Sequence, residues 1–222
     1  MMSQCYTIHR LPEELGHAPL NGPFKPEALS KPWSVLERAE LSSYPWDENG
    51  YRPPCFAMVG WNARGLHVLM YAREAELRVK VHAFGGRVCC DSCMEFFVQC
   101  APQRDGRYLN IECTSYPVML IGLGTDRYDR AELTRIPDGM YLQASRHEGE
   151  WWAVSYTIPA AYLDATFAVT LQPGLEMRGN FYICGDETAF PHYGMWRGFD
   201  PQIIPKPDFH QPSLFGRLIL AK

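Results

Sequence analysis

The fold is decided by one segment near the middle of the chain, Asp91-Ser92-Cys93-Met94-Glu95-Phe96-Phe97-Val98-Gln99. Its side chains alternate as in a β-strand, where successive residues point to opposite faces. One face consists of Ser92, Met94, Phe96 and Val98, and we expect this face to contact a hydrophobic core. The other face consists of Asp91, Cys93, Glu95 and Gln99, with Phe97 among them. This polar face predicts either a concave sheet surface that hydrogen-bonds hydroxyl groups or an edge strand turned toward solvent.

Short alternating segments recur on both sides of this strand, and glycine- and proline-rich turns separate them. Helical patterns are few, so the sequence predicts an all-β fold, a β-sandwich or jelly roll of roughly ten antiparallel strands. The segment 62–65 predicts a hairpin turn. The expected strands are residues 55–61, 66–72, 77–83, 91–100, 107–113, 117–123, 151–158, 167–171, 180–184 and 215–221.

The first 54 residues show little periodicity. Four prolines argue against long regular elements there, namely Pro19, Pro23, Pro26 and Pro32. We therefore expect an irregular N-terminal arm over residues 1–54, packed on a sandwich that spans residues 55–222. Three aromatic residues are expected to fix the arm to the sandwich, namely Trp33, Trp46 and Tyr51.

Composition narrows the classes of function. The net charge of −4 and the pI near 6.0 give no basic surface for nucleic acid. No apolar run approaches the roughly 20 residues of a membrane-spanning helix. Residues 1–6 lack the basic and apolar regions of a signal peptide, so a cytoplasmic protein with reduced, mostly buried cysteines is expected. Cys90-x-x-Cys93 has metal spacing, but no second pair follows it, and its two thiols are expected on opposite strand faces.

Catalytic motifs are not evident. A glycosidase needs two carboxyl groups about 5–10 Å apart, and Glu95 and Glu112 are expected on neighbouring strands where they could approach each other. The sequence has no Gly-x-Ser-x-Gly elbow, no glycine-rich phosphate loop and no His-Glu-x-x-His motif. The residues therefore favour a binding protein over an enzyme.

Four motifs in order carry a resemblance to a known family. They are Asp-Ser-x-x-Glu-Phe-Phe at 91–97, Tyr-Leu-Asn-Ile-Glu at 108–112, Gly-Asn-Phe-Tyr at 179–182 and Asp-Phe-His-Gln-Pro-Ser-Leu-Phe-Gly at 208–216. Together they resemble the family 9 carbohydrate-binding modules, which belong to the DOMON-like sandwiches. The resemblance extends from about residue 56 to the C-terminus.

The resemblance implies a non-catalytic module that binds a sugar, accessory to glycoside hydrolysis and carbohydrate catabolism, with a glycoside hydrolase as its partner. The family holds its ligand between two tryptophans, but Val88 stands at one of these positions and Phe209 at the other. Trp196 or Tyr193 is expected to replace the missing platform. The predicted ligand-binding residues are Glu95, Gln99, Asn110, Asn180, Tyr182, Phe209, Trp196 and Tyr193.

These residues also have structural interpretations. Asp91 is expected to cap the loop that enters its strand, because aspartate often bonds nearby backbone. Glu95 is alternatively a paired strand residue, and Asn110 and Asn180 alternatively fix loops. His210 is expected to be a structural hydrogen-bonding residue.

Two kinds of cofactor remain open. Family 9 modules contain structural calcium, and four loop carboxylates suit this cation, namely Asp126, Asp129, Asp186 and Glu187. Their spacing matches no known calcium loop.

The alternative function is a haem-binding redox domain, since related sandwiches hold haem through methionine and histidine or lysine. The chain has nine methionines and seven histidines.

Overall fold

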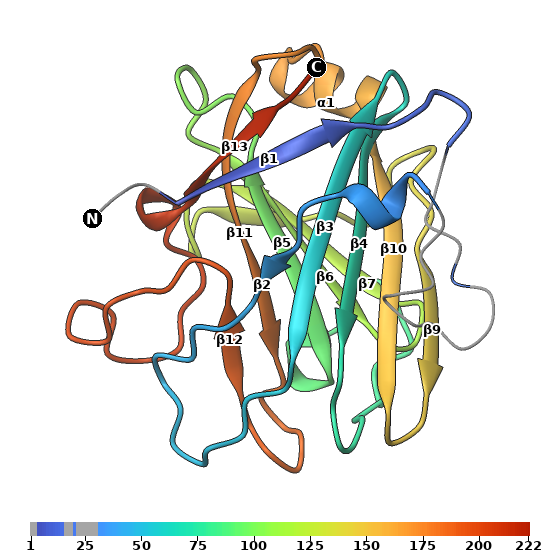
Figure 1. Ribbon diagram of the computed structural model, residues 1–222. Coiled ribbons are helices and arrows are strands. Elements are labelled where there is room, and N and C mark those ends of the chain that lie inside the picture. Colours follow the sequence, from blue (N-terminus) through green and yellow to red (C-terminus); the bar gives the residue numbers. More distant parts are fainter. Residues whose placement is uncertain (1–3, 16–19, 21–30) are drawn as a thin grey trace.

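The computed structural model describes residues 4–15, 20 and 31–222. These residues form thirteen strands and one short α-helix, which confirms the all-β prediction (Figure 1). Pro19, Pro23 and Pro26 and the first three residues lie outside the described part. No helix among the described residues is long and apolar enough to cross a membrane.

Two layers make up the sandwich. The layer that we call the site sheet has the strand order β8-β7-β6-β5-β11-β13, and the second sheet has the order β3-β4-β10-β9. The bounds in the site sheet are β5 Cys93–Gln99, β6 Tyr108–Thr114, β7 Met119–Gly124, β8 Arg130–Glu132, β11 Glu176–Cys184 and β13 Gly216–Leu220. Those in the second sheet are β3 Cys55–Asn62, β4 Gly65–Ala72, β9 Gln143–His147 and β10 Trp151–Pro159. Short strands β2 (Ala39–Glu40) and β12 (Tyr193–Met195) pair with β3 and β11.

The N-terminal arm differs from the irregular segment expected over residues 1–54. Strand β1 (Cys5–Arg10) pairs in parallel with β13 and then with β3, so it joins the two sheets. Figure 1 shows β1 crossing from β13 to β3. Its side chains alternate, with Tyr6 and Ile8 buried, and the segment is too short for this alternation to stand out in the sequence. These two pairings are also the exceptions to the antiparallel arrangement that was expected.

Two of the strands expected from the sequence, residues 77–83 and 167–171, are not formed in the described chain. Residues 77–83 are not paired in a sheet, because their backbone groups bind side chains instead: Lys80 N and Val81 N donate to Asp91 Oδ2 at 2.7 and 2.8 Å. Arg78 forms an ion pair with Asp91 as well. The prediction that Asp91 fixes the loop before β5 is thus confirmed. The strand expected at 167–171 is also absent: helix α1 (Ala160–Phe167) follows β10, and residues 168–171 after it belong to no strand.

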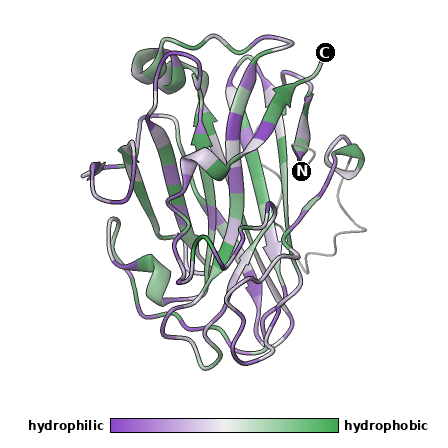
Figure 2. Ribbon diagram, turned by 90° about the vertical axis from the view of Figure 1, so that its left-hand side faces the viewer, coloured by the Kyte–Doolittle hydropathy of each residue, from purple (hydrophilic) through white to green (hydrophobic). Residues whose placement is uncertain are grey.

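The hydrophobic core lies between the sheets and contains the side chains that β5 was expected to bury. Met94, Phe96 and Val98 share one cluster with residues of β4 and β10, such as Val68 and Val154. The alternation of apolar and polar residues along the strands is visible in Figure 2. Burial of apolar surface contributes about 25 cal/mol per Å², and this cluster therefore fixes which face of β5 points outward.

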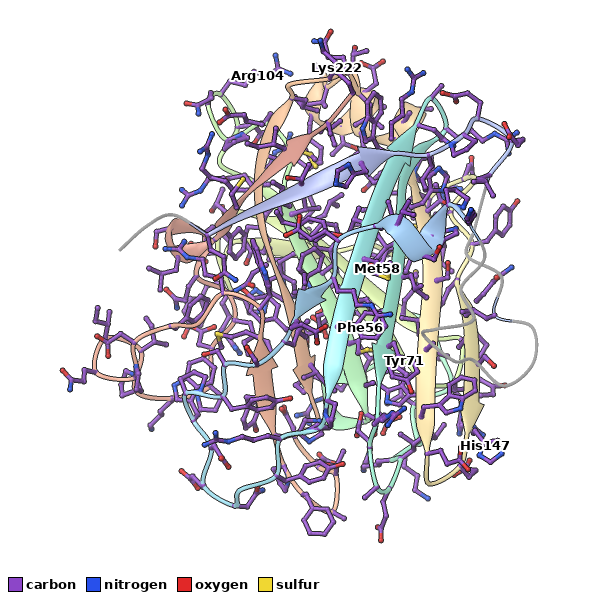
Figure 3. All side chains as sticks on the ribbon, viewed as in Figure 1. Phe56, Met58, Tyr71, Arg104, His147 and Lys222 are labelled. Atoms are coloured by element: carbon purple, nitrogen blue, oxygen red, sulfur yellow. The ribbon has the colours of Figure 1, made fainter. Side chains whose placement is uncertain are left out.

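Each sheet is also covered on its outer face. On the second sheet, Phe56 stacks on Tyr71 with ring centroids 5.2 Å apart, and fully buried Trp33 belongs to the same cluster. Figure 3 labels Phe56, Met58 and Tyr71 on this sheet. On the site sheet, the 3₁₀ helix Val88–Cys90 and the chain after β11 cover the strands with a second aromatic cluster. This covering leaves a pocket open on the outer face of β5 and β6.

Candidate functional site

A pocket of about 370 Å³ opens on the outer face of the site sheet. Its size lies within the usual range for small-molecule sites, about 300–1,000 Å³. Strands β5, β6 and β11 contribute to it, together with the turn before β8 and the closing segment 207–210. Its lining consists of Arg87, Cys89, Glu95, Glu112, Leu120, Arg127, Arg130, Glu132, Cys184, Asp186, Tyr193, Pro207, Asp208, Phe209 and His210.

Two glutamates lie side by side in this pocket. Glu95 on β5 and Glu112 on β6 are directly opposite each other in the antiparallel ladder, so their side chains share the outer face. Both are buried, with 3% and 6% of their surface exposed. Burial raises the pKa of Glu112 to about 7, although Arg130 acts in the opposite direction. Burial, followed by the charge of Glu112, raises the pKa of Glu95 well above its usual value.

Arg130 and Asn110 hold Glu112 in place. Arg130 Nη1 donates to Asn110 Oδ1 at 2.8 Å and lies 3.5 Å from Glu112 Oε1. Asn110 Nδ2 donates to the same Glu112 oxygen at 2.6 Å. A Cβ on the neighbouring Gly122 would overlap Asn110 Oδ1, so glycine is required there. Asn110 is fully buried behind the pocket, and its role is to orient the carboxylate and the guanidinium.

An aromatic group forms one wall. The ring of Phe209 stacks on Tyr182 with centroids 4.1 Å apart and an interplanar angle of 14°. The rings of Trp46 and Tyr193 pack against the same ring, with centroid separations of 6.0 and 6.3 Å. Tyr182 is fully buried under Phe209 and lies outside the pocket lining, whereas Phe209 is 7% exposed and lines it. The predicted Phe209 and Tyr193 therefore reach the pocket, and Tyr182 supports them.

His210 adds a neutral polar group. Its Nδ1 lies 2.7 Å from the Tyr108 hydroxyl. Burial, together with the charges of the nearby Arg130 and Arg127, lowers the pKa of His210 to about 3. The imidazole is therefore uncharged at neutral pH and acts as both donor and acceptor. Beside it, Arg127 pairs with Asp208 at 3.0 Å on the rim.

Three further predicted residues lie away from the pocket. Gln99 donates to Gly106 O at 2.9 Å and fixes the turn between β5 and β6. Asn180 accepts from Arg197 N and donates to Arg197 O, both at 2.9 Å, so it fixes the chain after β12. Trp196 follows Met195 onto the opposite face and packs against Phe181 in the core, 5.8 Å away. It cannot serve as the missing platform.

Val88 also lies outside the pocket lining. It is fully buried in its 3₁₀ helix, while its neighbours Arg87 and Cys89 face the pocket. Arg130 and Arg127 line the pocket but carry no signal in the sequence, because they lie in a charged segment without periodicity. Glu112 is expected from the sequence only as a possible catalytic partner of Glu95, and its place directly opposite Glu95 comes from the strand register.

The loop carboxylates considered for calcium do not form a cage. Asp126 accepts from two backbone N–H groups of its own turn, and Asp129 accepts from Thr125 Oγ1 at 2.9 Å. Glu187 pairs with Arg78 at 2.5 Å. Asp186 lies elsewhere, on the pocket wall. These residues do not fit the six to eight oxygen ligands that calcium takes.

Three of the seven histidines considered for haem lie in separate networks. His67 contacts Thr157 and Asn62, at 2.9 and 2.8 Å. His192 contacts Phe190 O at 2.8 Å, and His210 contacts Tyr108. Each of these contacts gives the ring a structural role.

Comparison with known proteins identifies the family of the chain. The family model for carbohydrate-binding family 9 matches residues 24–220, and the chain belongs to that family. None of the curated proteins matches the sequence.

Solved structures show the same fold. A Bacteroides uniformis protein assigned to carbohydrate binding superimposes with a TM-score of 0.75 at 24% identity, covering 98% of this chain and 99% of its own. A family 9 module from Caldicellulosiruptor kristjanssonii, solved with cellotriose, gives 0.60 at 11% identity and covers 98% and 94%. The same organism's module with glucose gives 0.58 at 11% identity and covers 99% and 97%.

Proposed function

We propose that this chain is a non-catalytic module that binds a carbohydrate in the pocket on the site sheet. The observation that carries the proposal is the presence of Glu95, Phe209 and Tyr193 in one pocket. These residues come from three distant parts of the chain. The family assignment supports the proposal because carbohydrate binding is the property that names the family.

The chemistry of the lining suits a sugar. Sugar rings present apolar C–H faces and a border of hydroxyl groups. Phe209 and Tyr193 offer apolar ring surface at the wall, while Glu95, Glu112 and Arg130 offer acceptors and donors on the floor. Asn110 and Tyr182 hold these groups from behind. Hydrogen bonds to charged groups contribute about 1.5–3 kcal/mol each, so two or three fixed contacts provide both affinity and orientation.

The size and shape of the pocket favour a small sugar. A volume of about 370 Å³ suits one or two sugar rings better than a long chain, since small-molecule pockets enclose most of their ligand. Glucose and cellotriose, which are present in structures of the Caldicellulosiruptor modules, are therefore sensible first ligands.

We also propose a wider role for the module. It acts in the cytoplasm beside a glycoside hydrolase, in carbohydrate catabolism. Sugar binding would keep the partner enzyme near its substrate. The free thiols of all eight cysteines support a reducing compartment.

A glycan array followed by calorimetry tests the proposal. The intact chain is screened on the array and titrated with glucose, cellotriose and the best array ligand. We expect Phe209→Ala to weaken binding by about 1–3 kcal/mol, the scale of a lost apolar contact. Phe190→Ala is the matched control, because Phe190 is 45% exposed and lies outside the pocket. Equal losses in both variants, or no binding by the wild-type chain to any glycan, would refute the proposal.

A further inference from the structure

We propose that Cys93, Cys184 and Glu95 form a binding site for Zn²⁺ or a similar thiol-binding divalent ion at the inner end of the pocket. The two thiol sulfurs and a carboxylate oxygen of Glu95 all lie within 4.8 Å of one another, and all three residues are buried. The proposal does not depend on sugar binding, because it rests on the ligand atoms alone.

The strand register brings these groups together. Cys93 and Glu95 are two residues apart on β5, so both side chains point to the outer face. Cys184 on β11 is directly opposite Cys93 in the antiparallel ladder. Cys184 Sγ lies 3.0 Å from Glu95 Oε1. Three ligand atoms thus face one point from two adjacent strands, which are rigid supports.

The donor set suits zinc. Zinc binds cysteine sulfur at about 2.3 Å and carboxylate oxygen at about 2.0–2.2 Å in tetrahedral geometry, so its ligand atoms lie roughly 3.5–3.8 Å apart. The spacing in this chain matches that range after small side-chain movements. Two thiolates and one carboxylate disfavour calcium and magnesium, which take oxygen ligands. On binding, both thiols release their protons to solvent, and so does the Glu95 carboxyl when it is protonated, because all three ligands bind in their deprotonated form.

The pocket provides the route by which an ion reaches the three ligand atoms. It also provides the space for a fourth ligand of the ion. Glu95 and Cys184 line the pocket, while Cys93 is fully buried and does not line it. An ion held by the three residues would therefore have one coordination position facing the pocket, open to water or to a ligand hydroxyl. This arrangement differs from Cys90-x-x-Cys93, because Cys90 belongs to a separate group with Cys89 and Asp186.

Cobalt binding tests the proposal. The intact chain, treated with chelator and kept in a non-thiol reductant, is titrated with Co²⁺ without sugar. We expect one Co²⁺ per chain, with a thiolate-to-cobalt charge-transfer band and the strong visible bands of tetrahedral Co²⁺. Added Zn²⁺ should remove these bands. Cys93→Ser and Cys184→Ser should each weaken Zn²⁺ binding at least tenfold and reduce the charge-transfer band.

Two further variants keep the test decisive. Cys100→Ser is the matched control, because Cys100 is equally buried but lies in the core between the sheets, and it should bind Co²⁺ like the wild type. Glu95→Gln leaves both thiols in place, so its charge-transfer band should persist while its affinity falls at least tenfold. The proposal is overturned if the wild type shows no charge-transfer band, or if the Cys93 and Cys184 variants bind Co²⁺ as the wild type does. Sugar titrations with chelator present decide the carbohydrate proposal separately.

Discussion

Replacing Glu74 with glutamine should make the protein more stable at alkaline pH. Glu74 follows β4, and its carboxylate accepts from Trp152 Nε1 and Ser92 Oγ, both at 2.8 Å. It thereby links β10 to the residue before β5, the strand that carries Glu95. Burial raises the pKa of Glu74 from 4.5 to about 7, so at pH 8 the folded protein holds a buried charge.

The magnitude follows from the pKa shift. Each pKa unit corresponds to 1.36 kcal/mol, so the shift corresponds to about 3 kcal/mol. Because the folded pKa is the higher one, the contribution of Glu74 to stability is fully present below pH 4.5 and is lost as the pH rises through about 7. Glutamine keeps the shape without the charge but weakens one hydrogen bond, a cost of about 1 kcal/mol. The net gain at pH 8 is therefore about 2 kcal/mol.

Urea unfolding of both proteins from pH 5 to pH 8 measures this effect. The difference between variant and wild type cancels the contribution of His210, whose lowered pKa acts in the opposite direction. His192 Nε2 lies 3.8 Å from Glu74 Oε2 and its pKa is also lowered, so the difference reports the Glu74–His192 pair. The difference should grow by about 1.4 kcal/mol per pH unit up to about pH 7 and then level off. A difference that stays constant across this range would refute the reasoning.

Two further predictions concern the site sheet. Asn180→Ala should lower the free energy of unfolding by about 1–3 kcal/mol, because it leaves the partly buried backbone N–H and C=O of Arg197 without their side-chain partner. Sugar affinity of the folded variant should persist, and lost affinity with unchanged stability would place Asn180 in the site instead. Sugar affinity should rise from pH 6 to pH 8, because Glu112, with its pKa near 7, accepts stronger hydrogen bonds when it is ionised. Calorimetry should show that this pH dependence vanishes in Glu112→Gln. A pH dependence that survives in the variant would exclude Glu112 as its source.

The sequence predicts which side chains of β5 face the core, because the alternation of apolar and polar residues along a strand is a local signal. The β5 pattern indicated which side chains enter the core, and the structure places Met94, Phe96 and Val98 there. The hairpin at 62–65 was also predicted correctly, since Asn62 pairs with Gly65. These features depend on neighbours in the sequence.

The composition of the site could be predicted only in part. Glu95, Tyr193 and Phe209 reach the pocket, but which polar residues face it depends on contacts between distant segments. The sequence predicts Asn180 as a ligand-binding residue, yet its side-chain amide bonds the backbone of Arg197. It predicts Trp196 as one of two possible replacements for the missing platform, yet Trp196, which follows the short strand β12, packs in the core. The pairing of Cys93 with Cys184 likewise becomes visible only from the register of β5 and β11.

The most direct test of the account is to locate the bound sugar by amide chemical shifts. The isotopically labelled chain is titrated with cellotriose or with the best array ligand, and the shift changes are assigned to residues. The account predicts that the largest changes cluster at Glu95, Glu112 and Phe209. Changes concentrated instead at the second pocket, which Leu133, Pro137 and Tyr162 line, would contradict the placement of the site.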